Sequence, residues 1–309
     1  MTSSPDPRQP PSRVGPDDPA ARAIAEAFST AVARLAAARA RARSGDPKGI
    51  RRLRTASRRL RSQLRAFRKL IDPEWGDRLV AELRWIGSTL GETRDLDVLR
   101  DRLANGESDT DREALRPLFD SLAERRGQAV KAVGRMLRGR RFRDLMAELE
   151  RSAAAPATIP KAGKPCRKVL PPLVARAWRR LRRESRGLTS ASPDQAFHDL
   201  RIVAKRARYV TELIAPTLGP RAQNRGTRLV ALARGVQDVL GAHQDAVVAA
   251  SAVAASLAQA DSDDAYHRAA VALLSRLRRA ADDARDDFLD RQLPELRRRK
   301  NRGELKSGG

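Results

Sequence analysis

The chain has 309 residues, a formal net charge of +25 at pH 7 and a sequence pI of about 11.5. It contains one cysteine, which excludes an intramolecular disulfide and fits a reducing cytoplasm, and no apolar run long enough to span a membrane. Only nine of the 63 basic residues are lysines, so most of the charge is arginine, the side chain best suited to bidentate phosphate contacts.

Helix is the predicted state of almost the whole chain, because Ala, Leu, Arg and Glu dominate and no segment reads as a strand. Residues 1–18, rich in Pro, Ser and Asp, are expected to form a disordered leader. A first half over 19–152 contains predicted helices at about 19–43, 47–71, 74–103 and 109–137, with a short segment at 142–151.

Residues 153–165 contain three prolines, which makes a continuous helix improbable and predicts a linker. The second half, over 166–302, has predicted helices at about 172–186, 196–218, 222–260 and 264–302. Residues 303–309 are expected to be a disordered tail. The predicted fold class is therefore all-α.

The predicted helix at 47–71 has two distinct faces. At about 100° per residue its arginines share one arc and its apolar residues share a neighbouring one. The basic face comprises Arg51, Arg54, Arg58, Arg61, Arg65 and Arg68, and the apolar face comprises Leu53, Ala56, Leu60, Leu64, Phe67 and Ile71. Like charges three and four residues apart destabilise a helix, so we expect an anionic ligand to offset them.

The two halves of the sequence repeat one pattern. R-L-R-x-x-x-R-R-x-R, starting at Arg52, precedes L-G-x-x-x-D, which ends at Asp95. D-L-R-x-x-x-K-R-x-R, starting at Asp199, precedes L-G-x-x-x-D, which ends at Asp245. The offsets are 147 residues from Arg54 to Arg201 and 150 from Asp95 to Asp245. Two ordered elements at nearly one offset predict an internal repeat whose basic faces meet in one channel.

The segment FHDLRIVAKRARYVTEL (197–213) resembles the signature helix of the CHAD family, the conserved-histidine α-helical domain. The resemblance extends over roughly residues 19–302, although Arg51 occupies the position of the first family histidine. It implies two antiparallel four-helix bundles related by a pseudo-two-fold repeat around a basic central channel. It also implies non-enzymatic binding of inorganic polyphosphate at cytoplasmic polyphosphate granules, where other granule-associated proteins could be partners.

The polyphosphate-binding residues implied by the two matching copies are Arg51, Arg54, Arg58, Arg59, Arg61, His198, Arg201, Lys205, Arg206 and Arg208. Further basic residues that could extend the channel are Arg34, Arg41, Arg138, Arg176, Arg179, Arg180 and Arg183. Asp95 and Asp245 are interpreted as ion-pair partners of the basic residues, and Glu212 as a partner of Arg208. The basic neighbours of Cys166 favour a lowered thiol pKa.

Two other functions remain open from the sequence. A basic helical surface binds DNA or RNA electrostatically, although few aromatic residues are present for base stacking. A polyphosphate-processing enzyme would need a metal–carboxylate cluster, and the acidic residues read instead as ion-pair partners. We therefore expect no catalytic residue, no metal and no cofactor, and we expect no membrane association.

Overall fold

The computed structural model describes residues 14–43, 46–105, 108–259 and 264–298. Its helices are α1 (Ala20–Arg43), α2 (Pro47–Ala66), α3 (Pro73–Ala104), α4 (Asp109–Ala114), α5 (Arg116–Arg138), α6 (Arg140–Arg151), α7 (Cys166–Val169), α8 (Pro171–Arg186), α9 (Asp194–Ile214), α10 (Pro220–Leu257), α11 (Asp264–Asp287) and α12 (Leu293–Arg298). Two short 3₁₀ segments, η1 (Pro160–Gly163) and η2 (Ala215–Leu218), and a π-helical turn, η3 (Phe288–Gln292), complete the described chain. The all-α prediction is confirmed.

Cap residues explain where the two helices at the centre of the first half begin. The Asp46 carboxylate accepts hydrogen bonds from the backbone N–H groups of Lys48 and Gly49, and Pro47 occupies the first turn of α2. Asp72 caps α3 in the same way, with Pro73 after it. Both helices therefore begin within one residue of the starts predicted at about 47 and 74.

Two predicted helices are interrupted. The helix expected over 109–137 divides at Leu115, where α4 ends and α5 begins with Pro117 in its first turn. A proline is tolerated there because its missing N–H would have no intrahelical partner. The helix expected over 264–302 contains the π-helical turn before α12, and its last predicted residues lie outside the described chain.

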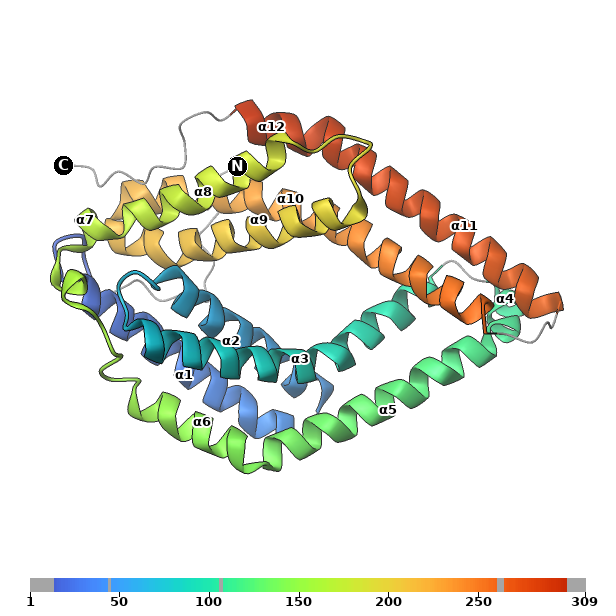
Figure 1. Ribbon diagram of the computed structural model, residues 1–309, viewed down its shortest axis with the longest axis horizontal. Helices are drawn as coiled ribbons and strands as arrows, with labels where there is room; N and C mark the ends of the chain where they lie inside the picture. The colour runs from blue at the N-terminus through green and yellow to red at the C-terminus, as the bar shows by residue number, and fades with distance from the viewer. Residues whose placement is uncertain (1–13, 44–45, 106–107, 260–263, 299–309) are drawn as a thin grey trace.

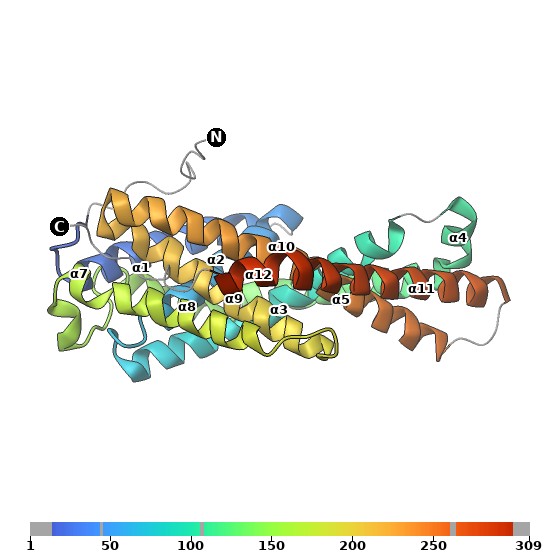
Figure 2. The ribbon, with the colours of Figure 1, turned by 90° about the horizontal axis from the view of Figure 1, so that it is seen from above.

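The elements form an elongated, ring-like arrangement in which α2 and α9 lie at the middle (Figure 1). Helix α2 packs against α1 and α3, α9 packs against α8 and α10, and α2 also contacts α9. Helices α5 and α11 run along opposite outer edges and converge at the end that carries α4, which contacts both (Figure 1). Figure 2 shows the molecule from above, with α4 at the same end. Within the described residues, no helix is long and apolar enough to cross a membrane.

One large apolar core joins the two halves. It includes Leu53, Leu60 and Leu83 from the first half and Leu200 and Val236 from the second. A smaller core lies at the α4 end and is built from α3, α4, α5, α10 and α11, with Leu103, Leu122 and Leu273 among its members. Both halves therefore depend on each other for burial.

Part of the predicted leader is ordered and packed, which corrects the expectation of disorder for residues 14–18. The predicted linker runs from α6 to α7 without an α-helix and packs against the core. In the segment 153–165, Ala162 is fully buried, and the backbone N–H of Ile159 donates to the carbonyl of Leu70. In the leader, Val14 is buried and the N–H of Cys166 donates to the carbonyl of Asp18. Residues 1–13 of the leader and the tail at 303–309 lie outside the described residues.

A substitution at Gly226 of α10 would test whether this helix has to approach η2 as closely as it does in the structure. A Cβ at this buried glycine would lie 2.5 Å from the Cβ of Ala215, closer than packed carbon atoms allow. We expect Gly226→Ala to lower the free energy of unfolding by about 1–3 kcal/mol, the usual range for overpacking. Chemical denaturation followed by circular dichroism measures this change.

The matched control is Gly127→Ala on the exposed face of α5, where an added Cβ meets nothing within 4 Å. It should raise the free energy of unfolding by up to about 1 kcal/mol, because alanine is the better helix former. Equal effects of the two substitutions would contradict the proposed close approach.

Candidate anion-binding site

Cations from α2 and α9 face one another where these helices meet. We define the basic cluster as Arg54, Arg58, Arg61 and Arg65 of α2 with Arg201, Lys205 and Arg206 of α9. The positive charge of Arg201 disfavours the charged form of Arg54, and that of Arg206 acts similarly on Arg61 and Arg65. Residues 140 or more positions apart in the sequence are therefore close enough for their charges to interact.

Burial and mutual repulsion both act on the basic cluster. Burial is the main cause that lowers the pKa values of Arg54, Arg61 and Arg201 below the ordinary arginine value. The pKa of Lys205 falls to about 7, first through burial and then through the charges of Arg201, Arg58, Arg54 and Arg208. The half-buried side chains of the basic cluster thus carry more positive charge than the nearby carboxylates neutralise.

Two arginine nitrogens inside the basic cluster lack hydrogen-bond partners. Within the described residues, the Nε atoms of Arg58 and Arg201 are buried and have no acceptor. An unsatisfied buried donor costs free energy, and a hydrogen bond between a cation and an anion is stronger than one between neutral groups. A bound anion with several oxygens would supply the missing acceptors and neutralise charge at the same time.

Glycines on α3 and α10 let the arginines lie across these helices. A Cβ at Gly87 would lie 3.3 Å from a terminal nitrogen of Arg61, and one at Gly241 would lie 3.4 Å from Nε of Arg201. At Gly91 the nearest atom of Arg54 is Nε, at 4.0 Å. A Cβ at Gly87 would be slightly too close to the Arg61 guanidinium, one at Gly241 would lie at the limit of ordinary contact with Arg201, and one at Gly91 would make ordinary van der Waals contact with Arg54.

Arg84 and Arg94 of α3 also belong to the site, and sequence reasoning did not include them. The charge of Arg84 lowers the pKa values of Arg61 and Arg65, and that of Arg94 lowers the pKa of Arg54. A signal for them was present, because Arg84, Gly87, Gly91 and Arg94 are spaced by three, four and three residues and share one helical face.

The predicted acidic partners differ in their contacts. Asp95 forms an ion pair with Arg54, with 3.2 Å between Oδ1 and a terminal nitrogen, as predicted. Asp245 favours the charged form of Arg201 electrostatically, but these two described residues form no ion pair within 4.0 Å. Glu212 lies 3.3 Å from Arg208, confirming that pair.

Several predicted ligand residues lie at the margins of the basic cluster. His198 is half-buried, and its Nδ1 lies 2.8 Å from Oε1 of Gln244. Nε of Arg208 donates to Gln237 at 3.1 Å, so this guanidinium is already partnered. Arg51 and Arg59 are both exposed on α2. The binding role of these four residues stays a prediction.

Arg180 is the ancillary residue that the structure ties to the basic cluster, because its charge lowers the pKa of Arg206 after the larger effect of burial. Arg180 also pairs with Glu184 at 2.9 Å, and Arg183 approaches the same carboxylate at 3.6 Å. For the remaining ancillary residues a role in binding stays a prediction; they are Arg34, Arg41, Arg138, Arg176 and Arg179.

Cys166 corrects one expectation. Its basic neighbours in the sequence favoured a lowered thiol pKa, but the side chain is fully buried. Burial, followed by the negative charge of Asp18, raises the pKa of Cys166 to about 11. Among the described residues, no group of three or more His, Cys, Asp and Glu side chains is arranged to hold a metal ion.

The CHAD domain family model matches residues 26–254 of the chain. Among solved structures, PptA from Streptomyces chartreusis is similar, with a TM-score of 0.75 and 22% sequence identity over 90% of this chain and 100% of that chain. The crystal structure of the CHAD domain from the plant Ricinus communis is similar with a TM-score of 0.67 and 19% identity over 96% of each chain. No functionally curated protein matches the sequence. At these identities the solved structures support the fold alone.

Lys205 predicts how stability depends on pH. Its folded pKa of about 7 lies below its ordinary value of 10.5, so between these pH values the unfolded chain binds a proton that the folded chain does not. The charge on Lys205 therefore lowers the free energy of unfolding by its full amount below pH 7. This loss of stability becomes smaller as the pH rises toward 10. We expect Lys205→Met to raise the free energy of unfolding most at pH 6 and progressively less at pH 8 and 10, measured by urea denaturation.

The control is Lys131→Met, which replaces an exposed lysine on α5. It should change stability by the same small amount at all three pH values. A pH-independent effect of Lys205→Met would contradict a buried, repelled ammonium group at this position.

Proposed function

The chain belongs to the CHAD domain family, and from this premise we propose that it binds inorganic polyphosphate without transforming it. The observation that carries the proposal is the meeting of cations from α2 and α9 in the basic cluster. Polyphosphate has about one negative charge per phosphate, and a line of guanidinium groups can replace the counterions condensed along such a polymer.

The proposed binding surface is a basic central channel between two related half-bundles. Matching contacts support this arrangement: Gly91 lies beneath Arg54 in the first half, and Gly241 lies beneath Arg201 in the second. In both halves the glycine of the L-G-x-x-x-D pattern therefore lies next to an arginine of the neighbouring basic helix. A narrow channel would accept a slender polyanion and exclude a duplex nucleic acid.

We also propose that the protein associates with cytoplasmic polyphosphate granules, an expectation that comes from the family. A fluorescent fusion expressed in cells with and without polyphosphate synthesis tests this directly. Punctate fluorescence that depends on polyphosphate would support the assignment, whereas uniform fluorescence in both cell types would contradict it.

Charge reversal within the basic cluster should abolish binding. We expect the combined variant Arg54→Glu, Arg58→Glu, Arg201→Glu and Lys205→Glu to lose at least about a hundredfold in affinity for long-chain polyphosphate. Each lost phosphate contact should also flatten the dependence of log K on log salt by roughly 0.7–0.9. Titration calorimetry at several salt concentrations measures both quantities, and circular dichroism checks helical content.

A matched control reverses four exposed arginines outside the basic cluster and changes the net charge by the same amount. The positions are Arg125, Arg143, Arg268 and Arg279. This variant should retain most of its affinity. Equal losses in both variants, or equal competition by DNA or RNA at the same phosphate concentration, would show that binding is a diffuse electrostatic effect.

Proton uptake provides a second test of the same site. At pH 8 the Lys205 amine, with a pKa of about 7, is mostly neutral, and a bound polyanion would raise that pKa. We expect polyphosphate binding at pH 8 to take up to one proton and its affinity to decrease between pH 7 and 9. Calorimetry in buffers with different ionisation enthalpies measures the uptake.

Lys205→Arg is the control for this experiment, because arginine keeps its charge over the whole range. The variant should bind at pH 8 without the proton uptake seen in the wild type. The same uptake in both proteins would assign it to another group and remove Lys205 from the binding site.

A further inference from the structure

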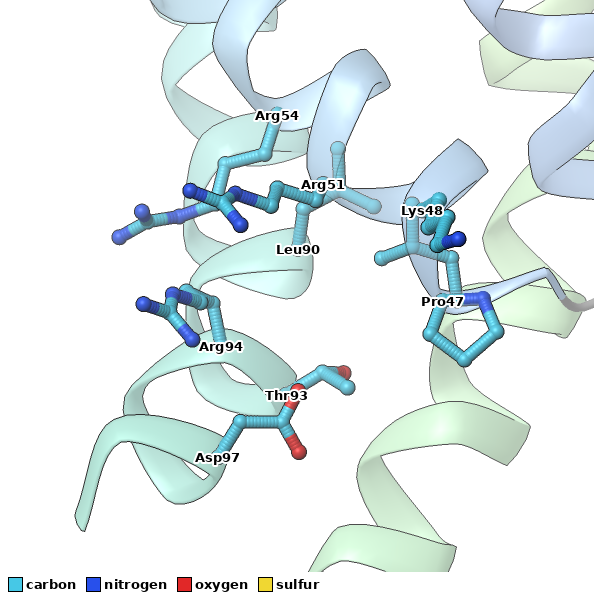
Figure 3. A pocket seen from close by; sticks show the side chains of 9 residues that line it. Pro47, Lys48, Arg51, Arg54, Leu90, Thr93, Arg94 and Asp97 are labelled. Carbon is cyan, nitrogen blue, oxygen red and sulfur yellow. The ribbon is translucent and has the colours of Figure 1, made fainter. Parts of the chain in front are cut away.

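A separate pocket lies at the first-turn end of α2, next to the basic cluster (Figure 3). Its volume is about 180 Å³, and Lys48, Arg51, Arg54 and Arg94 all contribute to its lining. Arg54 lines the pocket and also belongs to the basic cluster, so the pocket adjoins the cluster. The pocket therefore stands at one end of the proposed path of the polymer.

Negative charge around the pocket is already paired. Asp97 also lines it, but its Oδ1 lies 2.6 Å from Nε of Arg126 on α5. The carboxylate of Asp95 is paired with Arg54. Three cationic side chains, Lys48, Arg51 and Arg94, thus exceed the negative charge available at the pocket.

Thr93 supplies an independent observation. It lines the pocket and is 3% exposed, and its Oγ1 is buried without a hydrogen-bond partner among the described residues. Figure 3 shows Thr93 on α3 below Arg94. A buried hydroxyl without a partner is costly in an apolar site, and an acceptor bound in the pocket would satisfy it.

The second half fills the corresponding space with its own side chains. At the offsets of the sequence repeat, Asp194 corresponds to Pro47 and His243 to Thr93. The His243 ring is fully buried, its Nε2 lies 3.1 Å from Oδ1 of Asp194, and Arg285 lies 2.9 Å from the same oxygen. A proline and a threonine replace this aspartate and histidine in the first half, and there the structure contains a pocket.

We propose that this pocket is a subsite for a terminal phosphoryl group, taken from a short oligophosphate or from the end of a polyphosphate chain. A terminal phosphoryl group carries about −1.5 to −2 charges at neutral pH, more than an internal phosphate. The Thr93 hydroxyl donates to one of its oxygens, and Arg51 and Arg94 neutralise the additional charge. The inference rests on the proposed function, because the pocket would form one end of the proposed polyphosphate-binding surface.

Thr93→Val is the test variant, because valine keeps the shape and removes the donor. We expect about a tenfold loss of affinity for tripolyphosphate in titration calorimetry, the usual effect of losing one hydrogen bond to a charged group. The melting temperature should stay the same or rise, since an unsatisfied buried hydroxyl is removed. Thr93→Ser should recover most of the affinity.

Thr89→Val is the matched control. Thr89 lies one turn earlier on α3, and its hydroxyl already donates to the carbonyl of Trp85 at 3.2 Å. This variant should bind tripolyphosphate as the wild type does. Equal affinities of the Thr93→Val and Thr89→Val variants for tripolyphosphate, with long polyphosphate still bound, would overturn the subsite and leave the proposed function standing.

Long-chain polyphosphate with free or amine-capped ends separates the two sources of the phosphoryl group. If the pocket holds chain ends, capping should weaken binding to the wild type and have little effect on Thr93→Val. If it holds short free oligophosphates, capping should have no effect while tripolyphosphate remains sensitive to Thr93→Val. Failure of the wild type to bind long polyphosphate at all would instead refute the proposed function.

Discussion

Repulsion between buried cations is the constraint on which the rest of the structure depends. Arg54, Arg58, Arg201 and Lys205 lie close enough that each disfavours the charge of another. Pairs of like charges on a helix cost a few tenths of a kcal/mol each, and burial increases the cost. Leucines on the opposite faces of the same helices contribute about 1.5–3 kcal/mol each when fully buried. The core therefore holds together helices whose basic faces repel.

The same constraint explains the residues chosen on α3 and α10. A guanidinium needs room to cross a neighbouring helix, and glycine provides it most clearly at Gly87, where an added Cβ would lie 3.3 Å from Arg61. At the position matching Gly87 the second half has Gln237, which accepts a hydrogen bond from Arg208 instead. The arginine at this position therefore lies over a glycine in the first half and is held by a hydrogen bond to a glutamine in the second.

Helix positions and the basic faces could be predicted because their signals are local. Asp46 with Pro47 and Asp72 with Pro73 define helix starts, and the spacing of the arginines on α2 defines its charged face. The contact between α2 and α9 was accessible only through the sequence repeat and the family resemblance. Local patterns therefore predicted which residues share a face, and the repeat predicted which faces meet.

The features that were missed depend on tertiary packing. Prolines in the segment 153–165 predicted a linker, but not that the N–H of Ile159 donates to the carbonyl of Leu70 or that Ala162 joins the core. Charged neighbours favoured a lowered pKa for the Cys166 thiol, whereas its burial raises that pKa. Composition reports the conformational freedom of the chain and the charge near a residue along it. It does not report which groups that are distant in the sequence exclude water from that residue.

The two halves differ in the residues that occupy matching positions of the repeat. In the second half, His198 meets Gln244, and His243 fills the space beside Asp194 with protein atoms. In the first half, Arg51 and Arg94 stand at the positions of His198 and Gln244, so a contact between a histidine and an amide is replaced by two permanent charges. Such charges repel when the site is empty and are stabilised when an anion lies between them. Evenly spaced contacts along a channel suit a repeating polymer, whereas excess charge at one end favours the group with the most negative charge, which is where the polymer terminates.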